Sequence, residues 1–487
     1  MKKIFYSASV LLLLLTACNN DDPTFNEDQD RFYDVPAATL VANAQRELAD
    51  QLATPDVNLN PFRYYTQYWA ATQYPAESRY NIVSRSIANN LWNNLFRDVI
   101  GNLETAKAVI DADDSVGIDA ATKQNQKAII EIIQVYTYQI LVDTFGDIPY
   151  SEALDVTNVL PKYDDDAAIY PQLITRLNAA LANLDEAEGT FATGDLIFRG
   201  DIAKWKLFGN SLKVKLGTNL ADVNPTLAQA TIESAVADGV ILTNDQNATF
   251  DYSGAAPFYN PLYGSIVASN RNDYVASSTI VNAMNTLEDP RREVYFKTVD
   301  DDRNDETPEI YKGGVNGAGN AYLSFSAPGT ILEDPALEAL LFEATEVNFY
   351  LAEAAARGFS VNGTAADYYD AAITASFDYW GVPDVAAYLA TPAVAYTTAA
   401  GDWKQKIGTQ EWIAYFNRPV ESWTSWRRLD VPSLTPAINA VPISDGQIPV
   451  RFTYPIAEQT VNNANWIAAS AAIGGDNLTT HVFWDVN

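Results

Sequence analysis

Cysteine, histidine and basic residues are scarce in this chain. Its 487 residues include one cysteine and one histidine, which excludes an internal disulfide and a metal site built from several cysteine or histidine ligands. Lysine and arginine total 31 against 62 aspartate and glutamate residues, for a net charge of −31. Because binding to nucleic-acid phosphates depends on clustered cations, this balance predicts no nucleic-acid partner.

Local signatures of hydrolytic enzymes are also missing. The sequence contains no HExxH, no GxSxG and no cysteine after Cys18, so a metalloprotease, a serine hydrolase and a cysteine nucleophile are not indicated. Glycoside hydrolysis needs two carboxylates at about 5 Å or roughly 6.5–9.5 Å from each other, and their abundance here says nothing about their placement. His481 is interpreted as a surface or packing residue. We therefore predict no catalytic residue and no enzymatic activity.

Three consecutive aspartates at 164–166 are the first candidate for a cation site. Acidic side chains in the first turn of a helix are also favoured by the helix dipole. The helical pattern that follows makes this second interpretation the better one. We predict no metal site and no cofactor.

The N-terminus has the features of a secretory leader. Lys2 and Lys3 precede an apolar run that ends at Leu15, shorter than the roughly 20 residues that span a bilayer. The following LTAC resembles a bacterial lipobox, in which the chain is cut before the cysteine and the new terminus is acylated. This predicts a signal peptide at 1–17, lipid attachment at Cys18 and a polar tether at 18–34. The stretch Asn19-Asn20-Asp21-Asp22 is either a surface-export signal or a solvated part of the tether.

The main body has the periodicity of an all-α protein. Apolar positions at three- and four-residue steps predict helical pairs at about 84–142, 163–220, 334–381 and 403–429. The period is irregular, and a stretch rich in glycine and proline at about 239–333 interrupts it. We therefore expect one domain over 35–487, made of degenerate tetratricopeptide-like pairs with a loop-rich insertion and a few short strands.

The third pair, 334–381, has the clearest end signals. Asp334 is a good N-cap, Pro335 suits the first helical position, and Gly358 and Gly381 follow the last apolar residue of each predicted helix. The apolar face of the first helix is expected to comprise Leu337, Leu340, Leu341, Ala344, Val347, Leu351 and Ala354. This pattern indicates a scaffold role.

Two stretches, 62–80 and 258–274, mix tyrosine and tryptophan with polar residues and contain few aliphatic side chains. Such mixtures suit a surface that stacks on sugar rings or holds an extended peptide, with amides and arginines donating hydrogen bonds. The same rings can also fill gaps between helices.

The ligand-binding residues predicted from these stretches are Tyr68, Trp69 and Tyr74, with Asn272 and Tyr274 from the insertion. Ring stacking would supply contact area, and hydrogen bonds from side-chain amides would distinguish ligands by the arrangement of their hydroxyl groups. The expected ligand is an oligosaccharide or a peptide.

Several long motifs together resemble one protein family. They are the lipobox and, in order, TFGDIPYSEAL, PALEALLFEATEVNFYLAEAAARG, the 368–381 helix, QEWIAYFNRPVESWTSWRRLDVP and IPVRFTYPIAEQTVNNAN. This set resembles the SusD/RagB family of outer-membrane nutrient-binding lipoproteins, and its SusD-like branch most of all. The likeness covers essentially the whole chain after the leader.

The resemblance implies a surface-exposed lipoprotein on the outer membrane. Such a protein sits over a TonB-dependent, SusC-like transporter barrel and delivers captured oligosaccharide or peptide to it. Two other functions remain open at this point: a periplasmic or surface adaptor of the tetratricopeptide type that binds only proteins, and a glycoside hydrolase.

Overall fold

The computed structural model describes residues 35–113, 118–155, 157–299 and 310–487. The architecture below belongs to the compact unit Ala37–Asn487. The predicted signal peptide, the tether and Cys18 lie outside the described residues. Within the described ranges, no helix combines the length and apolar character needed to cross a membrane.

The unit is mostly helical, which confirms the predicted all-α class. Its principal helices are α2 (Ala37–Ala53), α4 (Ile87–Asn93), α5 (Asn102–Ala112), α6 (Ala120–Phe145), α7 (Asp166–Ala182), α8 (Ile202–Leu220), α9 (Pro225–Asp238), α13 (Ala344–Ala356), α14 (Ala365–Trp380), α16 (Trp403–Ala414) and α17 (Pro419–Leu429). A π-helical segment, Asn94–Gly101, joins α4 to α5. The two helices α18 (Ile456–Val461) and α19 (Asn463–Ala472) follow near the C-terminus.

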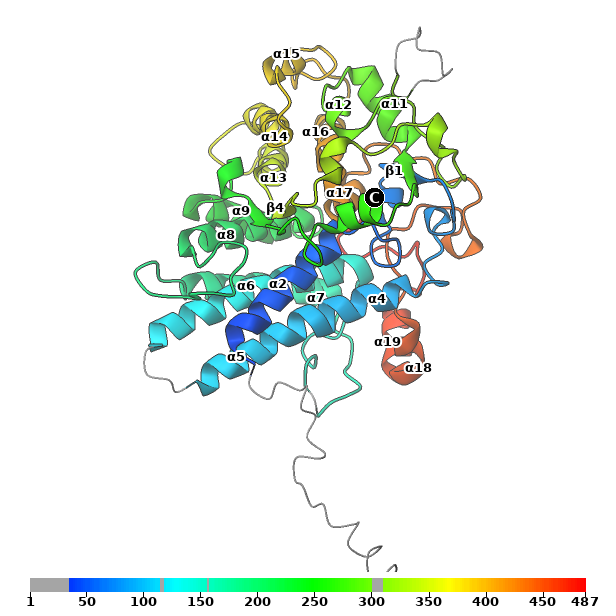
Figure 1. Ribbon diagram of the computed structural model, residues 1–487. Coiled ribbons are helices and arrows are strands. Elements are labelled where there is room, and N and C mark those ends of the chain that lie inside the picture. The colour runs from blue at the N-terminus through cyan, green and yellow to red at the C-terminus, as the bar shows by residue number, and fades with distance from the viewer. Residues whose placement is uncertain (1–34, 114–117, 156, 300–309) are drawn as a thin grey trace, which may run out of the picture. The chain divides into compact units, whose positions relative to one another are not determined.

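Neighbouring helices pack in one continuous array (Figure 1). Helix α5 contacts α2 and α6, α6 contacts α7, and α7 contacts α8. The array continues past the insertion because α8 also packs against α9 and α13, and α13 packs against α14 and α16. Each helix thus buries its apolar face only by stacking on its neighbours.

Local signals account for many helix ends. The side chain of Asp165 accepts a hydrogen bond from the Ala168 N–H and caps α7, and Asp166 lies in the first turn. Asp164 instead accepts hydrogen bonds from the Ser151 N–H and hydroxyl. Gly358 and Gly381 have φ of 88° and 65°, the left-handed conformation that ends a helix at low cost. Helix α9 was not predicted, and it packs against α8.

The predicted helix from Asp334 is wrong in its first ten residues. Ala339–Phe342 forms strand β4, which pairs antiparallel with β2 (Ala248–Phe250), and α13 begins only at Ala344. Asp334 instead accepts a hydrogen bond from the Ala336 N–H in a turn. All four β4 residues are buried, and a short apolar run of this kind cannot be assigned to helix or strand by periodicity.

The insertion contains short helices and strands, and one of its strands belongs to a second two-stranded sheet. Strand β1 (Trp69–Ala71) pairs with β3 (Tyr274–Ala276). The short helices in and around it are α3 (Phe62–Tyr65), α10 (Pro261–Tyr263), α11 (Ser278–Leu287), α12 (Arg292–Tyr295) and, after α14, α15 (Val385–Leu389).

Buried charges connect three helices of the array. Lys215 on α8 forms ion pairs with Glu421 on α17 and with Glu346 on α13, the latter at 3.4 Å. Arg418 contacts Glu346 at 2.8 Å. All four side chains are nearly inaccessible to solvent, and breaking such a pair leaves an unpaired buried charge. This network holds α8, α13 and α17 in register.

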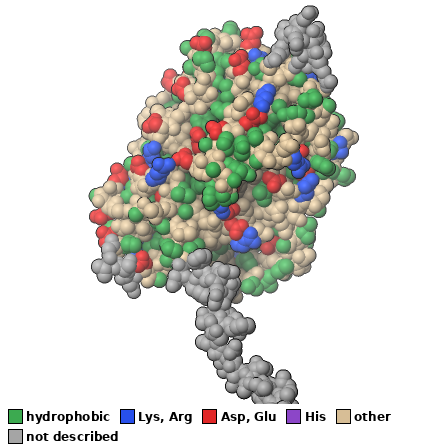
Figure 2. All heavy atoms as spheres, viewed as in Figure 1, with side chains coloured by type: hydrophobic (Ala, Val, Ile, Leu, Met, Phe, Trp, Pro, Cys, Tyr) green, Lys and Arg blue, Asp and Glu red, His purple; other side chains and the backbone are tan. Residues whose placement is uncertain are grey.

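Charge on the visible surface is dispersed. Figure 2 shows acidic and basic side chains spread among uncharged polar and hydrophobic groups on this face. The face in view presents no continuous basic patch.

Candidate functional site

The ladder of β1 and β3 joins two segments that are far apart in sequence. Trp69 lies opposite Ala276, and the N–H of Thr72 donates to the carbonyl of Asp273 at 3.0 Å just beyond the strands. The Thr72 hydroxyl also donates to the carbonyl of Asn272, 200 residues away in the chain. The ladder therefore places the two polar-aromatic stretches side by side.

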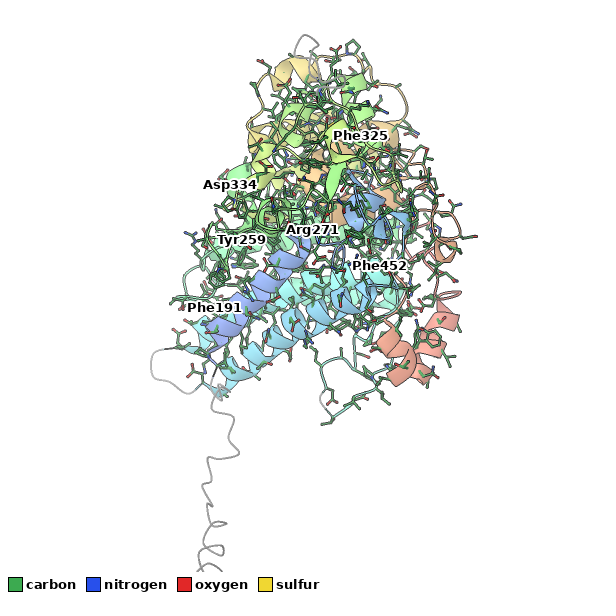
Figure 3. The ribbon with its side chains drawn as sticks, turned by 45° about the vertical axis from the view of Figure 1, so that its right-hand side comes forward. Phe191, Tyr259, Arg271, Phe325, Asp334 and Phe452 are labelled. Atoms are coloured by element: carbon green, nitrogen blue, oxygen red, sulfur yellow. The ribbon has the colours of Figure 1, made fainter. Side chains whose placement is uncertain are left out.

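An open pocket of about 230 Å³ lies between these segments. Its lining includes Asp56, Tyr74, Glu77, Arg85, Arg271 and Tyr274. A neighbouring hollow shares Tyr74, Arg85 and Arg271 and extends to Asn272. Figure 3 shows Arg271 near the C-terminal end of α2. Three of the five predicted ligand residues, Tyr74, Asn272 and Tyr274, are thus brought together.

Tyr74 is the aromatic ring that this pocket presents to solvent. Its side chain is 63% exposed, and its φ of 52° turns the chain sharply there. Tyr274 is 9% exposed, and its hydroxyl donates to the carbonyl of Pro55 at 2.9 Å. Its ring contacts that of Trp69 at 5.0 Å between centroids. Tyr274 therefore forms part of the wall, and Tyr74 is available for stacking.

Charged and polar groups surround the rings. Arg85 donates from Nε to the Glu77 carboxylate, which is 2% exposed, and Arg271 Nε lies 2.7 Å from Asp273 Oδ2. Burial raises the pKa of the Tyr274 hydroxyl, and nearby carboxylates raise it further. The phenol therefore remains protonated near neutral pH. Such a mixture of donors and acceptors suits a ligand that carries many hydroxyl groups.

Tyr68 and Trp69 are in the core, and the structure contradicts their prediction as a stacking surface. Tyr68 has no exposed area; its hydroxyl donates to the Trp412 carbonyl and lies 2.6 Å from Ser422 Oγ. Trp69 is 1% exposed and lies against the Arg63 guanidinium. Both rings fill space beneath the ladder, the alternative that the sequence left open.

The prediction also missed the charged residues of the pocket. Glu77, Arg271 and Asp273 lie inside the two polar-aromatic stretches, and Arg85 follows the first. Their position within those stretches was the available signal. The residues that the structure describes include no group of histidine, cysteine, aspartate and glutamate suited to a metal ion.

Comparisons with known proteins identify the fold. The family model described as "Starch-binding associating with outer membrane", a SusD-like model, matches residues 29–455. A solved chitin-binding protein is 28% identical, with a TM-score of 0.81 over 93% of this chain and 100% of that one. A chitin-binding SusD homologue from Flavobacterium johnsoniae is 26% identical, with a TM-score of 0.77 over 92% of this chain and 99% of that one.

A SusD homologue from Bacteroides thetaiotaomicron is 25% identical, with a TM-score of 0.77 over 93% of this chain and 100% of that one. No curated protein matches the chain. The family match covers most of the helical array, the β1–β3 ladder and the pocket beside it. This chain therefore belongs to the SusD-like family of starch-binding, outer-membrane-associated proteins.

Proposed function

We propose that this protein captures oligosaccharides at the cell surface and delivers them to a TonB-dependent, SusC-like transporter barrel. The observation that carries the proposal is the pocket beside the β1–β3 ladder, where the exposed ring of Tyr74 stands among paired charges and amides. An aromatic platform with hydroxyl-binding groups around it is suited to a sugar chain. Lipid attachment at Cys18 would hold the protein on the outer membrane.

We propose oligosaccharides of the chitin type, built from N-acetylglucosamine, as the first ligands to test. Two similar solved structures are named as chitin-binding. Gln73 in the pocket lining and Asn272 in the neighbouring hollow are both exposed. A side-chain amide can both donate to and accept from an acetamido group.

A binding role fits the pocket carboxylates better than hydrolysis does. Glu77 and Asp273 each form an ion pair with an arginine, so both carboxylates are engaged by neighbouring side chains. Glycoside hydrolysis requires one carboxyl group that gives up a proton to the leaving group. Release of reducing sugar from any bound oligosaccharide would contradict the binding role.

Calorimetry tests the site. Binding of chitin-type, starch-type and peptide ligands is measured for the parent and for Tyr74→Ala. Loss of the platform should weaken oligosaccharide binding by about 2 kcal/mol, roughly 30-fold, and leave the melting temperature unchanged because the ring is exposed. Phe258→Ala is the matched control, since Phe258 is 54% exposed on the insertion and is not part of the pocket lining. Equal losses in both variants would refute this site.

Two further measurements test the lipid anchor and the transporter partner. Mass spectrometry of the mature N-terminus should find a diacylated Cys18, and an uncleaved terminus would contradict the anchor. Co-purification from outer membranes should recover a transporter barrel; recovery of soluble proteins alone, with no sugar binding, would favour the adaptor function.

A further inference from the structure

The charges that line the pocket do not balance. Three carboxylates, Asp56, Glu77 and Asp273, face two guanidinium groups, Arg85 and Arg271. Arg85 is paired with Glu77, and Arg271 is paired with Asp273. Asp56 forms no ion pair within the described ranges. Since both cations are already neutralised, the lining retains one surplus negative charge.

Asp56 is held in place with one oxygen left over. It follows α2, and its Oδ1 accepts hydrogen bonds from the Asn58 N–H at 2.9 Å and from Asn58 Nδ2 at 2.6 Å. Its Oδ2 accepts none of the hydrogen bonds that the described residues form among themselves. The side chain is half-buried. Its charge also adds to the raised pKa of Tyr274, after burial and Asp273, so the carboxylate is close to that wall of the pocket.

The whole molecule reinforces this local charge. At a net charge of −31, the protein repels anionic ligands and attracts cationic ones at long range. An exposed tyrosine face such as that of Tyr74 also attracts a cation through its ring electrons. The pocket therefore offers a cationic group an unpaired carboxylate and an aromatic face within one lining.

We propose that the pocket prefers amino-sugar oligosaccharides with free, protonated amines over their N-acetylated and anionic counterparts, and that the Asp56 carboxylate accepts the ammonium group. This inference rests on the proposed function, because it assigns a substrate class to the same site. An N-acetylated sugar keeps the stacking contact and lacks the charge. An oligouronide brings a second negative charge to a pocket that already has one in excess.

Calorimetry with three oligosaccharides of equal length tests the preference: β-1,4-linked glucosamine, β-1,4-linked N-acetylglucosamine and galacturonate. At low salt and a pH that keeps the amine protonated, glucosamine oligomers should bind about fivefold more tightly than N-acetylated ones, as expected for one partly exposed charge pair. High salt should reduce this ratio, and so should a pH at which the amine is neutral. Oligogalacturonate should bind most weakly.

Asp56→Asn isolates the carboxylate, because asparagine keeps an acceptor for the Asn58 N–H and removes the charge. The ratio between glucosamine and N-acetylglucosamine affinities should fall to about one. Asp384→Asn is the matched control: it makes the same change in net charge at the exposed N-cap of α15, outside the pocket lining. Its ratio should equal that of the parent.

The outcomes distinguish failure of the amine preference from failure of oligosaccharide binding. Tighter binding of N-acetylated oligomers by the parent would overturn the preference and leave the proposed function in place. An unchanged ratio in Asp56→Asn, or an equal fall in Asp384→Asn, would overturn the role of Asp56. Failure of all three sugars to bind would overturn both the preference and the oligosaccharide function.

Discussion

Replacing Tyr68 with phenylalanine separates a structural role from a ligand role. Tyr68 belongs to the same aromatic stretch as Tyr74, but its ring lies in the core between Trp412 and Phe416, at centroid distances of 5.8 Å and 5.6 Å. The substitution removes only the hydroxyl and keeps the ring. Its effect therefore reports the hydrogen bonds that anchor this residue to α16 and α17.

The expected loss of stability follows from the buried hydrogen-bond partners that lose the Tyr68 hydroxyl. The Tyr68 hydroxyl donates a hydrogen bond to the Trp412 carbonyl, and it lies 2.6 Å from Ser422 Oγ. Ser422 is 1% exposed, so water cannot readily replace the lost partner. Leaving a buried polar group without its hydrogen bond costs about 1–3 kcal/mol. We expect Tyr68→Phe to lower the free energy of unfolding by about 2 kcal/mol with no change in oligosaccharide affinity.

Urea denaturation followed by tryptophan fluorescence measures the stability, and calorimetry on the folded variant measures the affinity. Tyr74→Phe is the control, since an exposed hydroxyl contributes little to stability. A Tyr68→Phe variant with parental stability and reduced affinity would show that Tyr68 contacts the ligand, and it would refute the placement of this ring in the core.

Two further predictions concern the scaffold. Val347→Asp should lower the free energy of unfolding by a few kcal/mol, because Val347 is fully buried on α13. Ala371→Asp, on the exposed side of α14, should have little effect. Similar urea midpoints for the two variants would contradict this placement. Burial, with the nearby Asp147 charge, raises the pKa of Asp166 from 3.8 to about 7. The folded state then holds its proton more tightly than the unfolded state, so this contribution to stability is complete below pH 3.8 and is lost as the pH rises to about 7. Asp166→Asn should flatten that part of the pH–stability curve, and an unchanged slope would refute the assignment.

Local chemistry predicted the helical array and not the elements that depend on distant partners. The caps at Asp165 and Gly381 depend on a few neighbouring residues, and the sequence is sufficient to place them. The first residues of the 334–381 hairpin became strand β4 because β2 lies beside them. No local period distinguishes such a short buried strand from a helical turn.

The same limit explains the mixed result for the ligand residues. Tyr68 and Tyr74 have the same side chain and lie six positions apart in one polar-aromatic stretch. Which of them is buried depends on the pairing of β1 with β3 and on the packing against α17. Residue type therefore predicted that the site mixes aromatic and polar side chains, and tertiary contacts decided which rings face solvent.

The β1–β3 ladder also determines when the pocket can exist during folding. Its partners are about 200 residues apart in the chain, and closing so long a loop has an entropic cost that only later contacts offset. The pocket lies beside this ladder, so it exists only when the insertion is docked on the array. A ligand that spans both halves stabilises the docked form by mass action. A ligand bound in the pocket would therefore favour the state in which the ladder is formed.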